Sequence, residues 1–209
     1  EMFEYGRDIL NKKRKNPEND LLSAIANAEL GGEKLSPEFL DGSWLLIIFA
    51  GNDTTRNTLS GAIKLLTENP EQRQKLIDQP ELMPNFLQEC IRMISPVMHM
   101  RRTTTCETHV GEQLMGAGEK IVMWYGAANR DPAVFAQPDR FNIERENAAK
   151  HLAFGIGRHT CVGKPVALMQ LAESYKQILT RFPNIRMSGD WKVAPNNFVH
   201  AIQEMPVKL

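Results

Sequence analysis

A single cysteine, framed by glycines at the start of a helical pattern, constrains this chain more than any other feature. The stretch FGIGRHTCVG covers residues 154–163, and apolar residues then recur at helical spacing to about Phe182. A thiol at a helix N-terminus faces unpaired backbone N–H groups and the positive end of the helix dipole, which favour a thiolate. Gly157 and Gly163 permit close approaches that a side chain would block. Cys161 is therefore predicted to be a ligand or nucleophile that lies against a flat, bulky partner.

Three other kinds of site fit this loop poorly. A dinucleotide-binding loop needs a third glycine, but Thr160 follows Gly155 and Gly157 at that place. A phosphate-binding loop needs Ser or Thr after Gly163-Lys164, where the chain has Pro165. Structural zinc needs four ligands, and no paired-cysteine spacing exists. A nucleophilic cysteine with a distant histidine base, and an inert buried cysteine, both stay open.

Composition narrows the class of protein. The chain has 25 basic and 25 acidic side chains, so it gives no electrostatic reason to expect nucleic acid or an anionic membrane as partner. The basic run 12–15 is interpreted as a solvated helix end. The three cysteines are odd in number and far apart, which favours a reducing compartment, and we expect the cytoplasm. No long apolar run or signal-peptide layout is present, so a soluble protein is predicted.

The hydrophobic periodicity predicts a mainly α-helical protein with small β-sheets (α+β). Ser36 and Pro37 mark the start of a long helix to about residue 69, whose apolar centre, 44–50, is predicted to be buried. Asp20 is expected to cap a second helix. Further helices are predicted over 1–15, 71–78, 80–95 and from just after Cys161 to about Phe182. Short strands are predicted over 97–125 and near the C-terminus, and an irregular segment over 129–150.

Three motifs then occur in an order that resembles the cytochrome P450 family. The cysteine loop fits Phe-x-x-Gly-x-x-x-Cys-x-Gly, AGNDTT (50–55) resembles the family's oxygen-activating helix, and ECIR (89–92) resembles its Glu-x-x-Arg helix. The family's fold is about twice this length. The resemblance therefore implies the P450 fold in its C-terminal portion, with residues 1–209 as part of a single haem-binding domain whose N-terminal half is absent.

The resemblance implies haem b as cofactor, with Cys161 as the axial ligand of its iron. Phe154 is expected to pack on the proximal side of the ring, beside Gly157 and Gly163. His159 and Arg102 are expected to contact the haem propionates, because buried carboxylates require such pairing. Arg101 is the alternative to Arg102, and His99 is a further candidate.

The same resemblance implies roles for two pairs of residues. Asp53 and Thr54 match the acid and alcohol that deliver protons during oxygen activation, and a carboxylate inside an otherwise apolar helix is costly without such a task. Their alternative is a local kink in which Thr54 bonds back to a carbonyl. Glu89 and Arg92 lie one turn apart and can form an ion pair, with Arg140 expected as a third, structural member.

The implied activity is insertion of one oxygen atom from O2 into an unactivated C–H bond of an apolar substrate. GNDTTRNT and HMRRT look most like bacterial members that hydroxylate the terminal carbon of alkanes or fatty acids. Ferredoxin and ferredoxin reductase are the expected electron donors. Alternatives are a steroid or terpenoid hydroxylase, a peroxide-driven haem enzyme, and a haem-binding sensor or fragment without oxygenase activity. The residues expected to line the substrate site are Phe49, Ala50, Val97, Met98 and Phe198.

Overall fold

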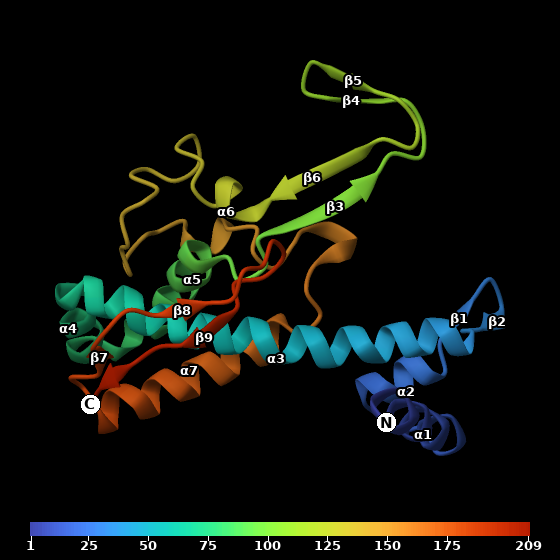
Figure 1. The fold of residues 1–209 in the computed structure, drawn as a ribbon, viewed down its shortest axis with the longest axis horizontal. Helices are drawn as coiled ribbons and strands as arrows, with labels where there is room; N and C mark the ends of the chain where they lie inside the picture. The colour runs from blue at the N-terminus through green and yellow to red at the C-terminus, as the bar shows by residue number, and fades with distance from the viewer. The chain divides into compact units, whose positions relative to one another are not determined.

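The computed structural model describes residues 1–209 and divides them into two compact units, Glu1–Asn52 and Asp53–Leu209. The long helix α3 (Pro37–Glu68) contributes its first half to one unit and its second half to the other (Figure 1). Its observed bounds agree with the helix expected from Pro37 to about residue 69. The expectation of a single domain over the whole chain stays a prediction.

The first unit is a small helical cluster. It contains α1 (Met2–Lys15), α2 (Leu21–Ala26), a hairpin of β1 (Glu29–Leu30) and β2 (Glu33–Lys34), and the first half of α3. Asp20 caps α2 as predicted, because its Oδ1 accepts the Ser23 N–H at 2.7 Å. Arg14, in the basic run, donates to the carbonyls of Ala26 and Leu35. The unit's core consists of Leu10, Ala26, Leu40 and Trp44.

One prediction for α3 is wrong in this structure. The apolar stretch 44–50 was expected to be buried, and Trp44 is buried at 6% exposure. Four of its neighbours are exposed instead: Leu45, Leu46, Ile48 and Phe49. The reason is that the core of this unit reaches only the face of α3 that carries Leu40 and Trp44.

Helices form the core of the second unit. Its main helices are the second half of α3, α4 (Pro70–Asp78), α5 (Met83–Ile94) and α7 (Lys164–Arg181), with the short α6 (Tyr125–Ala128). A buried apolar cluster joins α3, α4, α5 and α7. The Tyr175 hydroxyl on α7 also donates to the Leu59 carbonyl on α3 at 2.5 Å. The buried residues of the cluster are Ala62, Leu66, Leu76, Phe86, Leu87, Cys90, Ile91, Phe141, Ile143, Leu171, Tyr175 and Leu179.

Small antiparallel sheets surround this helical core, as the sequence predicted. In the second unit β3 (His99–Thr103) pairs with β6 (Lys120–Trp124), and β4 (Thr108–Val110) pairs with β5 (Gln113–Met115) at the far end of that ribbon (Figure 1). Near the C-terminus β7 (Arg186–Met187) pairs with β10 (Val207–Lys208), and β8 (Lys192–Val193) with β9 (Ile202–Glu204). The segment 129–150 is irregular but ordered by hydrogen bonds, and three 3-10 turns complete the unit: Pro80–Leu82, Ala148–Lys150 and Gly157–His159.

Candidate functional site

The cysteine loop presents an accessible thiol just before α7. Cys161 is exposed, and its backbone N–H donates to the Phe154 carbonyl at 2.7 Å, which closes the loop. Thr160 also bonds back to the Gly157 carbonyl, through its N–H at 3.1 Å and its Oγ1 at 2.9 Å. Gly163 is the N-cap of α7. The thiol of Cys161 therefore lies at a helix N-terminus, as the sequence predicted.

Glycine is required in this loop at a position that sequence reasoning did not single out. Gly155 and Gly157 have φ of +71° and +64°, in the left-handed region that disfavours side chains. A Cβ at Gly155 would lie 2.8 Å from the His159 carbonyl oxygen, whereas a Cβ at Gly157 would meet nothing within 4 Å. A Cβ at Gly163 would only reach ordinary contact with Cys161 Sγ, at 3.7 Å. The Phe-Gly-x-Gly spacing was the available signal for Gly155.

Replacing Gly155 with alanine should destabilise the loop more than the same change at Gly157. Both substitutions place a Cβ at a positive φ, which costs about 1 kcal/mol, but only the first also forces the His159 carbonyl to move. We expect Gly155→Ala to lower the free energy of unfolding by about 2–3 kcal/mol. Denaturant titration measures the free energy of unfolding of both variants. Equal losses of stability in Gly155→Ala and Gly157→Ala would contradict the close approach between residue 155 and the His159 carbonyl.

Alternation along β3 divides its arginine and histidine side chains into two sets. Neighbouring residues of a strand face opposite sides, so half-buried Arg102 shares a face with Met100, and exposed Arg101 shares the other with His99. Arg102 donates to the Arg101 carbonyl, and neither Arg102 nor exposed His159 pairs with a carboxylate. Both side chains are thus available for an acidic ligand, and Arg101 and His99 cannot act on the same face of β3 as Arg102.

The residues present fit the haem that the resemblance implies. Cys161 offers one exposed sulfur ligand, and no group of three or more His, Cys, Asp and Glu side chains could hold a bare metal ion. Haem would need only one ligand from the protein, which Cys161 could supply, because the porphyrin itself would hold the iron. Arg102 and His159 supply hydrogen-bond donors of the kind that propionates need.

The expected proton-delivery pair lies on α3 in the second unit. Asp53 is partly exposed, and its Oδ1 accepts a hydrogen bond from Arg56 Nη2 at 2.8 Å. Its backbone carbonyl accepts from the side chain of Asn57 at 2.7 Å, and Asn57 Oδ1 in turn accepts the Ile202 N–H at 2.9 Å. Asn57 is buried at 1% exposure and thereby joins the turn of α3 at Asp53 to β9. Sequence reasoning did not identify Asn57.

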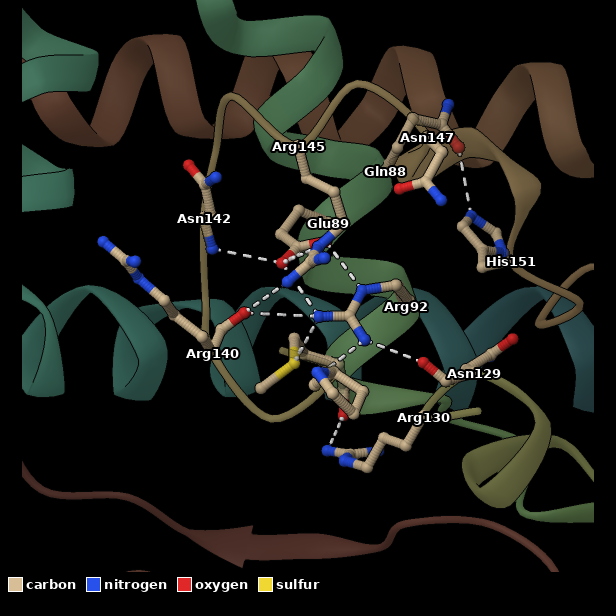
Figure 2. A network of polar contacts seen from close by, with 12 residues as sticks. Gln88, Glu89, Arg92, Asn129, Arg130, Arg140, Asn142, Arg145, Asn147 and His151 are labelled. Carbon is tan, nitrogen blue, oxygen red and sulfur yellow. Dashed lines mark hydrogen bonds and ion pairs between the residues drawn. The ribbon is translucent and has the colours of Figure 1, made fainter. Parts of the chain in front are cut away.

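The Glu89–Arg92 ion pair is completely buried on α5, and Figure 2 shows its contacts. Arg92 Nε lies 2.7 Å from Glu89 Oε2, and Arg92 Nη2 lies 2.9 Å from Oε1. Arg92 Nη1 donates to the carbonyls of Asn129 and Pro138 at 2.7 and 2.8 Å. The Asn142 N–H donates to Glu89 Oε1 at 3.1 Å. This cluster therefore holds the irregular segment 129–145 against α5.

The prediction that Arg140 is the third member is wrong. Arg145 supplies the second guanidinium, with its Nε 3.1 and 3.2 Å from the two Glu89 oxygens (Figure 2). Arg140 turns its carbonyl inward, where Arg145 Nη2 donates to it at 2.8 Å, and its exposed side chain bonds only Gln137 Oε1. A turn at Gln137, with φ of +48°, lets the segment fold back so that Arg145 reaches Glu89.

Exchanging these two arginines for alanine separates their roles. Arg145→Ala removes a charged partner of Glu89 and the donor to three backbone carbonyls, so we expect it to lower the free energy of unfolding by about 2 kcal/mol. Arg140→Ala should change stability by less than about 0.5 kcal/mol, because that side chain is exposed. Thermal or denaturant unfolding of both variants tests this prediction. A larger loss of stability in Arg140→Ala than in Arg145→Ala would contradict the observed network.

A buried histidine connects this network to the cysteine loop, and the sequence analysis did not identify it. His151 is 6% exposed, and its Nε2 lies 3.0 Å from Gln88 Oε1 on α5. Its ring lies 5.6 Å from that of Phe154, over which Lys164 Nζ lies at 5.4 Å. Burial lowers the pKa of His151 to about 4, and the positive charges of Lys164 and Arg92 act in the same direction, against Glu89.

Three of the expected substrate-lining residues lie side by side in the second unit. The Met98 N–H donates to the Phe198 carbonyl at 2.8 Å, and Val97 forms an isolated bridge with Val199. The Phe198 ring lies 5.9 Å from that of His99, whose buried Nδ1 has no hydrogen-bond partner. The other two lining residues, Phe49 and Ala50, belong to the first unit, and their role stays a prediction.

Comparison with known proteins decides the family. The model of the family described as Cytochrome P450 matches residues 1–204. The chain belongs to the cytochrome P450 family. The steroid C26-monooxygenase of Mycolicibacterium smegmatis is 37% identical over 98% of this chain and 51% of its own length. The linalool 8-monooxygenase of Pseudomonas putida is 34% identical over 100% of this chain and 51% of its own length.

A solved structure confirms the P450 fold. Mycobacterium marinum CYP268A2, in complex with pseudoionone, aligns with a TM-score of 0.91 and 36% identity over 100% of this chain and 50% of its own. This P450 chain thus spans about half the length of the relatives it matches. None of its helices is long and apolar enough to cross a membrane.

Proposed function

We propose that this P450 chain is the haem-binding part of a monooxygenase that inserts one atom of O2 into an unactivated C–H bond of an apolar substrate. The observation that carries the proposal is the exposed Cys161 thiol, which a closed, glycine-dependent loop holds at the start of α7. Haem held by a thiolate supplies the activation of O2 for this reaction. Haem b would be bound through Cys161, with Phe154, Gly157 and Gly163 in the supporting loop.

Two side chains that have no carboxylate partner would hold the acidic groups of the cofactor. Arg102 on β3 and His159 in the loop each offer nitrogen donors to a carboxylate, and neither has an acidic partner within the chain. Charge-assisted hydrogen bonds of this kind are about twice as strong as neutral ones. Their pairing with the propionates would orient the ring above Cys161.

Asp53 and Thr54 would move protons to the reacting site. Asp53 is partly exposed, so water can reach its carboxylate, and it pairs with the exposed guanidinium of Arg56. Thr54 follows it on the same helical turn and can pass a proton through its Oγ1. Asn57 fixes the Asp53 carbonyl against β9 and so holds this turn in place.

The substrate is proposed to be apolar and to contact Val97, Met98 and Phe198. Relatives named for a steroid and for linalool, and a structure in complex with pseudoionone, support the steroid or terpenoid class, which we place first. The motifs GNDTTRNT and HMRRT support alkanes or fatty acids as the second class. Ferredoxin and ferredoxin reductase are the proposed electron donors, and the reducing cytoplasm suits the free cysteines.

Isotope incorporation tests the proposed function. The haem-loaded chain is incubated under ¹⁸O2 with reduced ferredoxin and its reductase, and with a steroid, linalool or a linear alkane, and the products are analysed by mass spectrometry. We expect one ¹⁸O atom in an alcohol product. Asp53→Asn should slow product formation by about 10²-fold or more, while Thr55→Ala, next to the pair, should have little effect.

Two outcomes would contradict the proposal. Turnover with peroxide but not with reduced ferredoxin would indicate a peroxide-driven enzyme. A haem-loaded chain that gives no alcohol from any of the three substrates would support the sensor or inactive-fragment alternative.

A further inference from the structure

We propose that Gln88, Asn129 and His151 form a latch that positions the Cys161 loop from the buried Glu89–Arg92–Arg145 network. The inference rests on the proposed function in taking Cys161 as the haem ligand. Its evidence lies in the hydrogen bonds of the segment 151–154, which leads into the loop. We call these three side chains the His151 latch.

Both ring nitrogens of His151 have defined roles. Nδ1 accepts the N–H of Ala153 at 3.2 Å, so it carries no proton. In the neutral ring the proton is therefore on Nε2, which donates to Gln88 Oε1 at 3.0 Å. One bond fixes the ring to Gln88 on α5 (Figure 2). The other fixes it to the backbone that precedes Phe154. A buried imidazole with both nitrogens satisfied is held in one orientation.

Asn129 provides the second connection between the network and the same segment. Its Oδ1 accepts the Leu152 N–H at 2.7 Å, and its Nδ2 donates to Ser95 Oγ at 2.8 Å. Its backbone carbonyl accepts from Arg92 Nη1 at 2.7 Å. Asn129 is fully buried, so each of these bonds lies in a low-dielectric environment where it is strong. Leu152 is thus fixed to the Glu89–Arg92 pair through one residue.

Backbone hydrogen bonds connect this segment to the cysteine. The Leu152 carbonyl accepts the Gly155 N–H at 2.8 Å, and the Phe154 carbonyl accepts the Cys161 N–H at 2.7 Å. The Phe154 ring lies close to both the His151 ring and the ammonium group of Lys164 at the start of α7. The carbonyl that closes the cysteine loop therefore belongs to a residue that contacts both side chains. His151 and Gln88 act on Cys161 through this carbonyl and are positioning residues.

The burial of the latch argues that it has a specific task. Burying polar groups costs free energy, and an apolar side chain of similar size would pack more simply at His151. The polar groups of the latch instead satisfy the backbone N–H groups of two successive residues, Leu152 and Ala153. Such bonds define one backbone path, which a ligand loop needs and an apolar contact does not provide.

Amide exchange of Cys161 tests the latch without haem. The rate is measured by NMR or mass spectrometry in the unaltered chain, in His151→Phe, which keeps an aromatic ring but loses both hydrogen bonds, and in Gln88→Leu. We expect the Cys161 amide to exchange about tenfold faster or more in both variants. Gln88→Glu keeps an oxygen acceptor for Nε2 and should restore slow exchange. His109→Phe, at an exposed histidine on β4 that has no assigned role, is the control and should leave the rate unchanged.

Core amides separate positioning from general destabilisation. The amides of Leu171 and Tyr175 in α7 should keep their exchange rates in all of these variants. An unchanged Cys161 rate in both His151→Phe and Gln88→Leu, or an equal acceleration of Cys161 and the α7 core, would overturn the proposal. If His151→Phe does not fold, the comparison of Cys161 amide exchange in Gln88→Leu and Gln88→Glu tests the proposal.

A second readout uses the haem-loaded chain. His151→Phe and Gln88→Leu should show a smaller fraction of the carbon monoxide band of thiolate-bound haem than the unaltered chain. Gln88→Glu should recover it. A missing thiolate band in the unaltered chain would count against the proposed function, whereas unchanged amide exchange would count against the latch alone. The two failures are therefore distinguishable.

Discussion

Replacing Glu89 with glutamine is expected to lower the free energy of unfolding by about 3–5 kcal/mol, because it leaves two buried guanidinium groups without their counter-charge. Glu89 and Arg92 are fully buried, and Arg145 is 8% exposed, so water cannot replace the lost carboxylate charge. Denaturant unfolding measures the loss. Because the segment 129–145 is held through this cluster and leads to the cysteine loop, we also expect Glu89→Gln to lose haem rather than to slow turnover.

Glu144→Gln is the matched control for this prediction. Glu144 lies in the same segment and pairs with Lys75, but both side chains are substantially exposed. Exposed ion pairs contribute about 0–1 kcal/mol, so this variant should remain close to the unaltered chain in stability. A stable Glu89→Gln protein that keeps its haem and reacts slowly would contradict the structural role of the cluster.

Acid is expected to remove about 3 kcal/mol of stability through His151. Its pKa is about 4 in the folded chain against an ordinary 6.5, so the folded state favours the neutral ring. The unfolded chain therefore binds the proton more readily than the folded chain between these two pH values. The contribution is complete above pH 6.5 and is lost progressively as the pH falls towards 4. Below that pH, protonated Nδ1 can no longer accept the Ala153 N–H.

A glutamine variant isolates this contribution. The free energy of unfolding is measured from pH 7 to 4 in the unaltered chain and in His151→Gln, which has no imidazole to protonate. The pH dependence should be weaker in His151→Gln. Identical pH profiles in the two proteins would contradict the lowered pKa of His151 in the folded chain.

The sequence predicted the regular elements well because their signals are local. Asp20 and Pro37 mark helix starts that the structure confirms, and the period of apolar residues gave α5 and α7 within a few residues. Glu89 and Arg92 lie one turn apart, so their pairing also follows from helical spacing. These inferences need no knowledge of how the chain folds back on itself.

Contacts between distant segments could not be predicted in the same way. Arg140 and Arg145 lie in an irregular segment without periodicity, so the sequence does not show which of the two side chains reaches Glu89. His151 has a polar character that gave no hint of burial against Gln88, which is 63 residues away in sequence. The exposure of Leu45 and Leu46 depends on which neighbours pack on α3, and helical periodicity does not reveal those neighbours.

The central claim is that Cys161 is the thiolate ligand of haem, and the carbon monoxide difference spectrum of the reduced, haem-loaded chain tests it most directly. We predict a red-shifted Soret band typical of thiolate ligation, lost in Cys161→Ala and retained in Cys106→Ala, which removes the other exposed cysteine. The same band in Cys161→Ala, or no such band in the unaltered chain, would contradict the account.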